Sequence, residues 1–188
     1  MSASRCRQLL CVVGRHGSGK TTLARAVAKK NGWHHISVGF LRRLALNRQI
    51  VPGIPLSLVL SMGRLKPGEF LPCLLSKKLL EYALSFDVCV LDGFPASREH
   101  VMLLPEDAII CVLVSPKKVR KRRLLERAGA TSRKWSEGRA SARDDALPDM
   151  LRFAGQSHVV VFVRNADGNK SLDAAIERIR SLVLSGPD

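Results

Sequence analysis

Apolar residues occur in five short runs, and longer stretches with helical spacing separate them. The runs are Leu9–Val13, His34–Ser37, Asp87–Leu91, Ala108–Val114 and Val159–Val163. Short runs of this kind, often β-branched, are typical of strands that are buried on both faces of a parallel sheet. The pattern therefore predicts an α/β fold in which helices cover both faces of the sheet.

The stretches between these runs are of two kinds. Within Lys20–Lys30 and Leu172–Leu184, apolar residues return every three or four positions, which predicts helices with one buried face. Proline and glycine divide 38–84 into shorter pieces, so we expect a small helical insertion there. The stretch 129–142 is polar and rich in arginine and has little periodicity, and we expect a surface loop.

A phosphate-binding motif directly follows the first predicted strand. Residues 14–21 read Gly-Arg-His-Gly-Ser-Gly-Lys-Thr, which fits G-x-x-x-x-G-K-[ST] between a strand and a helix. Glycines let consecutive main-chain N–H groups point inward, where they and the helix N-terminus attract a polyphosphate. We expect Lys20 to bridge the outer phosphates and the Thr21 hydroxyl to bind Mg²⁺. The alternative is a glycine-rich turn that binds no nucleotide.

The chain is strongly basic. It has 31 Lys and Arg against 16 Asp and Glu, a formal net charge of +15, so we expect an anionic partner. No apolar run is long enough to span a membrane, which argues against membrane insertion. The 5 cysteines are odd in number and mostly lie in apolar runs, which indicates reduced core thiols. We expect a cytoplasmic location, and the sequence leaves a mitochondrial or nuclear location open.

Two further motifs resemble those of the adenylate kinase and nucleoside monophosphate kinase family. Asp92-Gly93-Phe94-Pro95 follows the third predicted strand, and Ser37-Val38-Gly39 opens the insertion, with Arg43 one turn later. With the loop at 14–21, the resemblance covers nearly the whole chain. It implies that the γ-phosphate of ATP is transferred to a nucleoside monophosphate, with AMP as the leading acceptor, and that the free enzyme is a monomer.

The resemblance also implies an architecture. This is a P-loop three-layer sandwich with five parallel strands in the order 2-3-1-4-5. A single domain over 1–188 would include a monophosphate-binding insertion at 38–84 and a short lid loop at 128–143.

Individual residues receive roles from the same resemblance. The catalytic side chains would be Lys20, Arg43, Asp92, Arg123, Arg127 and Arg143. ATP would contact Gly14, Gly17, Ser18, Gly19, Lys20, Thr21, Thr22, Arg123 and Ala166. The monophosphate would contact Gly39, Arg43, Gly93, Phe94 and His100. Thr21 and Asp92 would hold Mg²⁺.

The acceptor side departs from the family pattern. Val38 stands where the family has threonine, Ala96 where it has a phosphate-binding arginine, and His100 where it has the glutamine that reads adenine. Arg98 is a poor replacement for an arginine at position 96, because two residues are about 200° of rotation on a helix.

Basic residues are concentrated in 117–143. This segment holds eleven basic and two acidic residues, and thus nine of the +15 net charges. The excess over what one nucleotide needs is typical of proteins that bind polyanions. A second hypothesis is therefore a catalytically weak or inactive adenylate-kinase-like assembly factor that binds RNA or a ribonucleoprotein through 117–143. The intact loop at 14–21 and Arg43 favour the kinase.

Overall fold

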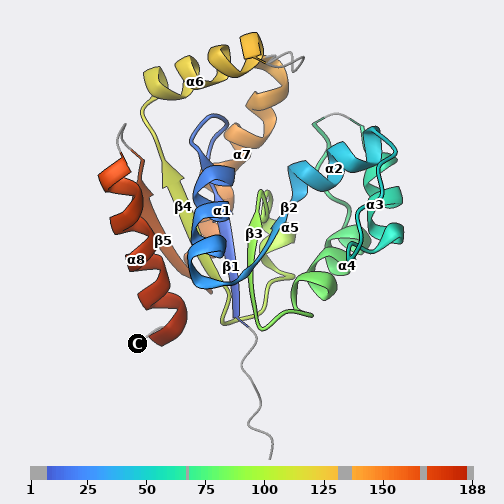
Figure 1. Cartoon of the computed structure of the whole chain (residues 1–188), viewed down its shortest axis with the longest axis horizontal. Coiled ribbons are helices and arrows are strands. Elements are labelled where there is room, and N and C mark those ends of the chain that lie inside the picture. Colours follow the sequence, from blue (N-terminus) through green and yellow to red (C-terminus); the bar gives the residue numbers. More distant parts are fainter. Residues whose placement is uncertain (1–7, 67, 131–136, 166–168, 186–188) are drawn as a thin grey trace, which may run out of the picture.

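Five parallel strands form the middle layer of the structure (Figure 1). They are β1 (Gln8–Val13), β2 (His34–Ser37), β3 (Val88–Asp92), β4 (Ile109–Val114) and β5 (Val159–Arg164). Their order across the sheet is β2-β3-β1-β4-β5, and each neighbouring pair is parallel. The computed structural model describes residues 8–66, 68–130, 137–165 and 169–185. The predicted fold class and strand order are both confirmed.

Different helices cover the two faces of the sheet. Side chains of β1 alternate between two core clusters, with Leu9 and Cys11 in one and Leu10 and Val12 in the other. The cluster around Leu10 is closed by α1 (Lys20–Asn31) and α8 (Asn169–Ser185). The cluster around Leu9 is closed by the helices on the opposite face, which include α5 (Arg98–Val101). Burial on both faces explains why the strands appear in the sequence as continuous apolar runs.

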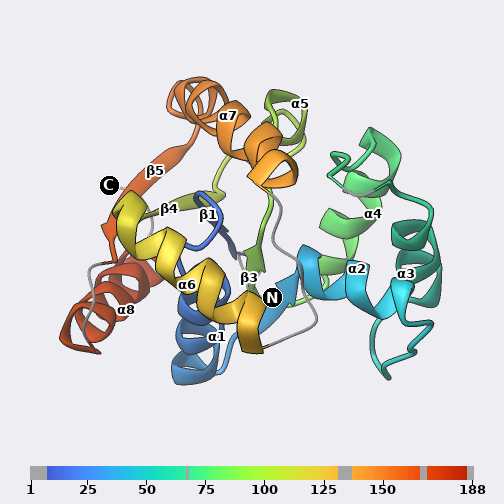
Figure 2. The same ribbon diagram turned by 90° about the horizontal axis from the view of Figure 1, so that it is seen from above.

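Three short helices occupy the insertion between β2 and β3. They are α2 (Val38–Leu46), α3 (Leu56–Gly63) and α4 (Cys73–Ala83). Pro55 and Pro72 immediately precede α3 and α4, where a missing N–H leaves no helical hydrogen bond unmade. Figure 2 shows these helices beside the β2–β3 side of the sheet, so the insertion forms one wall next to the ends of these strands.

The segment between β4 and β5 differs from the predicted loop. It contains α6 (Lys117–Ala130) and α7 (Glu137–Ala154), and only 131–136 of the expected loop lie outside the described residues. Alanine, glutamate and arginine favour a helix at the start of α7 by intrinsic propensity. The apolar periodicity used for the prediction does not register this preference. In Figures 1 and 2, α6 crosses over the end of the sheet from which the loop at 14–21 emerges.

The cysteines of the strands lie in the core. Cys11, Cys89 and Cys111 are buried and free of disulfides. Burial raises the pKa of Cys89 and of Cys111 to about 12, so these thiols stay protonated and pack as small apolar groups, as predicted. Among the helices of the described ranges, none has the length and apolar character needed to cross a membrane.

Parallel pairing brings the functional segments to one edge of the sheet. In the register, Asp92 lies opposite both Val12 and Ser37, and Val13 lies opposite Val112. The carboxyl ends of β1, β2, β3 and β4 therefore meet, which is where open parallel sheets bind their ligands.

Candidate nucleotide and acceptor site

The shape of the loop between β1 and α1 depends on its glycines. Gly14 and Gly17 have φ values of 144° and 78°. A Cβ atom at Gly14 would lie 2.5 Å from the carbonyl oxygen of Leu113, and one at Gly17 would lie 2.7 Å from that of Arg120. Because these neighbours are main-chain atoms, a side chain at either position would displace the loop. The phosphate-binding loop is thus seated against the ends of β4 and α6.

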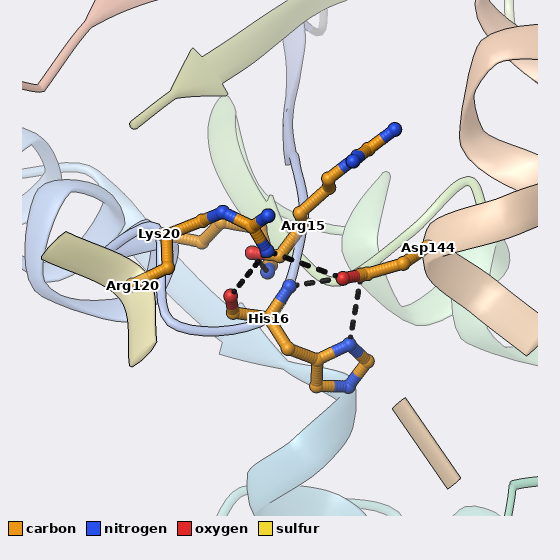
Figure 3. A network of polar contacts seen from close by, with 5 residues as sticks. All are labelled: Arg15, His16, Lys20, Arg120 and Asp144. Atoms are coloured by element: carbon orange, nitrogen blue, oxygen red, sulfur yellow. Dashed lines mark hydrogen bonds and ion pairs between the residues drawn. The ribbon is translucent and has the colours of Figure 1, made fainter. Parts of the chain in front are cut away.

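Lys20 is the first residue of α1, and its side chain reaches back along the loop. Its Nζ donates a hydrogen bond of 2.9 Å to the carbonyl oxygen of Arg15 (Figure 3). Burial lowers the pKa of Lys20 to about 8, although the carboxylates of Asp92 and Asp144 act in the opposite direction. The nearby carboxylates offset only part of the cost of burying the Lys20 charge. A bound anion would therefore stabilise the charged form of this lysine.

Asp92 ends β3 and is buried beside the start of α1. Its Oδ2 accepts hydrogen bonds from the hydroxyl of Thr21 at 2.6 Å and from that of Ser37 at 3.1 Å. Hydroxyl and carboxylate oxygens are ligands that Mg²⁺ accepts together with water and phosphate oxygens. The donor set formed by Thr21 and Asp92 therefore fits a magnesium ion.

A cleft of about 470 Å³ opens between this loop and the insertion. The residues predicted from the sequence that line it are Gly17, Gly19, Lys20, Thr21, Thr22, Gly39, Arg43, Asp92, Gly93, Arg127 and Arg143. Lys20, Arg43, Arg127 and Arg143 come from α1, α2, α6 and α7. Cationic groups from four helices therefore line a single cleft, which suits ligands that carry several phosphates.

Other predicted nucleotide contacts lie around the loop. Gly14 lines a smaller cavity of about 70 Å³ together with Lys20, Gly93 and Arg143. Ser18 is buried, and its carbonyl oxygen accepts a hydrogen bond of 3.3 Å from Nη1 of Arg123. Ala166 lies outside the described residues.

Phe94 and His100 do not line the described cavities around the loop, although both were predicted to contact the monophosphate. They are buried and stacked, with ring centroids 4.6 Å apart. Nδ1 of His100 accepts a hydrogen bond of 3.1 Å from the N–H of Ala96, and its Nε2 lies 2.8 Å from the carbonyl oxygen of Leu71. Both ring nitrogens are thus engaged by the main chain, so this side chain connects the segments that contain Leu71 and Ala96. Burial also lowers the pKa of His100.

Arg143 connects α7 to the insertion. Its Nη2 donates a hydrogen bond of 2.8 Å to the carbonyl oxygen of Glu69, which Arg42 also contacts, and its guanidinium lies 5.8 Å from the ring centroid of Phe70. Burial and the neighbouring charge of Arg42 lower the pKa of Arg143 to about 10. A guanidinium whose pKa is lowered by a second guanidinium in this way favours an anion nearby.

Comparison with known proteins identifies the family. A family model described as an AAA domain matches residues 13–138. The adenylate kinase of Streptococcus mutans serotype c is 24% identical over 94% of this chain and 98% of its own length. That of Nitratiruptor sp. is 25% identical over 97% of this chain and 98% of its own length. The chain belongs to the AAA-domain family, as a P-loop kinase of the adenylate kinase and nucleoside monophosphate kinase type. The resemblance predicted from the sequence is confirmed.

A shorter match agrees with this assignment, and a solved structure shares the fold. The adenylate kinase of Baumannia cicadellinicola is 29% identical over 63% of this chain, and the match spans 57% of that protein. The shikimate kinase from Acinetobacter baumannii in complex with shikimate superimposes with a TM-score of 0.57 at 17% identity, covering 95% of this chain and 93% of that one. At this identity the second likeness shows the shared P-loop kinase fold alone.

In this adenylate-kinase-type fold, three polar residues contact the P-loop in ways that sequence analysis did not assign. Asp144 of α7 and Arg120 of α6 both contact His16, and Nδ2 of Asn165 donates a hydrogen bond of 2.7 Å to the carbonyl oxygen of Ser18. One signal was present in the sequence, since His16 is a polar ring directly before the Gly17-Ser18-Gly19 stretch of the loop. Its partners lie more than 100 positions further along the chain, and no local pattern connects them.

Proposed function

We propose that the protein transfers the γ-phosphate of ATP to a nucleoside monophosphate, with AMP as the preferred acceptor. The observation that carries this proposal is the single cleft in which the P-loop, the insertion and both helices around 131–136 contribute cationic side chains. A hydrolase needs one polyphosphate site, whereas a cleft bordered by a separate helical insertion offers room for a second phosphorylated substrate.

The residues of the cleft divide into two groups. Lys20 and the P-loop hold the donor, because they lie at the start of α1 and present main-chain N–H groups and one amine. Arg43 holds the acceptor phosphate from the insertion, and Arg127 and Arg143 line the same cleft from α6 and α7. In-line transfer needs charge stabilisation on the moving phosphoryl group and exclusion of water, and arginines from several elements supply the first.

Thr21 and Asp92 hold Mg²⁺ in this proposal. The ion neutralises part of the phosphate charge when it is bound. Hydrogen bonds within the chain orient both ligands. The Thr21 hydroxyl donates to Oδ2 of Asp92, and the Ser37 hydroxyl donates to the same oxygen.

The choice of AMP is supported by the relatives, which are named adenylate kinases. His100 does not select the base in this proposal, because its two ring nitrogens are already hydrogen-bonded to the main chain. The insertion at 38–84 acts as the acceptor domain, and 128–143 acts as the lid.

The test is phosphoryl transfer from ATP to AMP, CMP, UMP and GMP in the presence of Mg²⁺, with Lys20→Ala as the blank. We expect diphosphate formation that depends on Lys20 and is fastest with AMP. Retained ATP binding without transfer to any of the four acceptors would contradict the proposal. Transfer to a different base at a higher rate would leave the reaction intact and change only the acceptor.

A second candidate function rests on the outward side of α6. Lys117, Lys118, Lys121 and Arg122 are exposed there, whereas Leu124 on the same helix is buried. These four charges lie outside the lining of the cleft, and such a row attracts the phosphates of RNA. RNA binding whose affinity falls steeply with salt, and which Lys118→Glu and Lys121→Glu weaken without changing transfer, would support it. An RNA affinity that neither substitution changes would contradict this second function.

A further inference from the structure

One residue of the P-loop is held by both helices that flank 131–136. The main-chain N–H of His16 donates a hydrogen bond of 2.9 Å to Oδ1 of Asp144, and Nδ1 of its ring lies 3.0 Å from the same oxygen. Arg120 contacts the other side of this pair, since its Nη1 lies 3.3 Å from Oδ2 of Asp144 and 3.1 Å from the carbonyl oxygen of His16. Figure 3 shows Arg120 and Asp144 both reaching His16 of the loop.

The state of the Asp144 carboxylate determines the tautomer of His16. Burial acts to raise the pKa of Asp144, but hydrogen bonds from the ring and main chain of His16 outweigh it, and the pKa is lowered. An ionised carboxylate can only accept hydrogen bonds. The proton of a neutral His16 therefore resides on Nδ1, and Nε2 is left with a lone pair that can take up a second proton.

The remaining edge of the ring belongs to the phosphate site. His16 lines both the cleft and the smaller cavity, beside Lys20 and Arg143, and 40% of its side chain is exposed. Its Nε2 makes no hydrogen bond to any residue in the described part of the chain. In Figure 3 the ring extends away from the loop backbone, with Nδ1 turned toward Asp144. An oriented imidazole edge is therefore available to a ligand in the cavity.

The charges around His16 favour a phosphate as that ligand. The larger cleft contains the cations Arg25, Arg43 and Arg127 and the anion Asp92. In the smaller cavity, Lys20 of α1 and Arg143 of α7 lie beside His16, Arg120 of α6 contacts its carbonyl oxygen, and Asp144 is the carboxylate that contacts its ring. The carboxylate is already compensated by Arg120 and by His16, so it does not repel an incoming phosphate as a bare charge would. A hydroxyl acceptor, for which a neutral histidine could serve as general base, does not need three cations around it.

We propose that His16 is a phosphate-binding residue of the reaction, with Asp144 and Arg120 as positioning residues. The proposal rests on the proposed function. The protonated ring donates its Nε2–H to an oxygen of the acceptor phosphate. The bond between the γ-phosphorus and the β–γ bridging oxygen breaks, and a bond between that phosphorus and an acceptor phosphate oxygen forms. The Nε2 proton stays on His16 throughout the transfer.

The kinetic test compares wild type with His16→Ala and His16→Gln from pH 6.0 to 8.5. Loss of a charge-assisted hydrogen bond predicts an acceptor KM about tenfold higher in His16→Ala at low pH, with the ATP KM changed less than twofold. The difference shrinks as pH rises, because only the charged ring donates from Nε2 while Nδ1 stays bonded to Asp144. Glutamine carries an amide donor of similar reach, so His16→Gln recovers part of the low-pH affinity but none of the pH dependence.

Asp144→Asn tests whether the aspartate acts through the histidine. We expect its acceptor KM to rise about as much as in His16→Ala, and the double variant to be no worse than either single variant, because linked residues are not additive. His158→Gln is the matched control. His158 contacts the carbonyl oxygen of Pro105 at the opposite end of the sheet, so its pH profile stays that of wild type.

Calorimetry of AMP binding in buffers with different heats of ionisation provides a readout that does not depend on turnover. Wild type takes up more protons than His16→Gln at pH 7.5 if the ring becomes charged on binding. Equal proton uptake, or equal pH profiles, would overturn the role of His16 and leave the transfer reaction intact. Absence of both transfer and AMP binding in wild type would overturn the proposed function together with this role.

Discussion

In the proposed reaction, the donor and acceptor sides of the cleft are built from different kinds of groups. The donor side uses main-chain N–H groups of a glycine loop, together with Lys20 and the pair formed by Thr21 and Asp92. The acceptor side depends on side chains, and two that lie near it are used elsewhere. His100 holds the main chain of Ala96 and Leu71, and Arg98 pairs with Asp149 of α7.

A binding site formed by main-chain N–H groups therefore tolerates more amino-acid substitutions than one formed by side chains. A loop such as 14–21 needs only glycine at the right positions, because the backbone supplies the donors. An acceptor site made of side chains loses a contact with each substitution, as at Ala96. We expect removal of the Lys20 amine, the donor-side cation that acts on the transferred phosphoryl group, to abolish the reaction. Substitutions on the acceptor side are expected to change which acceptor is used or how tightly it binds.

The largest expected effect is that of Lys20→Ala. Removing a preorganised cation from the moving phosphate lowers kcat by roughly 10²–10³-fold. Lys29→Ala, on the exposed side of the same helix, is the control. Steady-state transfer to AMP measures both variants. Because the pKa of Lys20 is lowered to about 8, ATP affinity in wild type is also expected to fall as pH rises above that value. Near-normal turnover of Lys20→Ala would contradict the role that we give to the donor side.

Arg43→Ala is expected to act on the acceptor. Loss of a charge-assisted phosphate contact raises the acceptor KM by about ten- to a hundredfold and leaves the ATP KM nearly unchanged. Lys78→Ala removes a positive charge from the same insertion away from the cleft and provides the control. An equal rise in both KM values would show that the two sides do not separate in the way we describe.

His100→Ala is expected to affect stability rather than selectivity. The side chain is 2% exposed and satisfies two main-chain groups, so its removal costs about 2–4 kcal/mol of the free energy of unfolding. The ratio of rates with AMP and CMP stays unchanged. Denaturant unfolding and the acceptor panel measure the two effects. A change in the ratio without a loss of stability would place His100 back in the acceptor site.

The buried state of His100 also predicts a pH dependence. Burial lowers its pKa below the usual 6.5, so the unfolded chain binds this proton more readily than the folded one. The contribution to stability is complete above about pH 6.5 and is lost as pH falls through the folded-state pKa. The slope of unfolding free energy against pH below 6.5 should decrease in His100→Phe.

Arg98→Ala carries the smallest expected effect. The guanidinium is exposed and paired with Asp149, with 2.6 Å between Nε and Oδ2, so it does not replace the arginine absent at position 96. We expect unchanged KM values for ATP and acceptor. Ala96→Arg is the informative partner, since a guanidinium at that position would line the smaller cavity and lower the acceptor KM. A raised acceptor KM in Arg98→Ala would show that the surface pair opens to serve the cleft.

The strands, the fold class and the phosphate-binding loop were predictable from the sequence alone. These features are local, because a buried parallel strand is a short apolar run and the P-loop is a contiguous motif with fixed glycine spacing. The convergence of Thr21 and Asp92 also followed, since parallel strands end at one edge.

The partners of the remaining polar side chains depend on the tertiary structure. Propensity without apolar periodicity formed the start of α7 where a loop was predicted. His100 and Arg98 were taken into packing and a surface ion pair by neighbours from other elements. His16 and Asp144 are separated by 128 positions, and their contact depends on where α7 crosses the loop. Such pairings are set by the packing of whole elements, which short-range patterns do not encode.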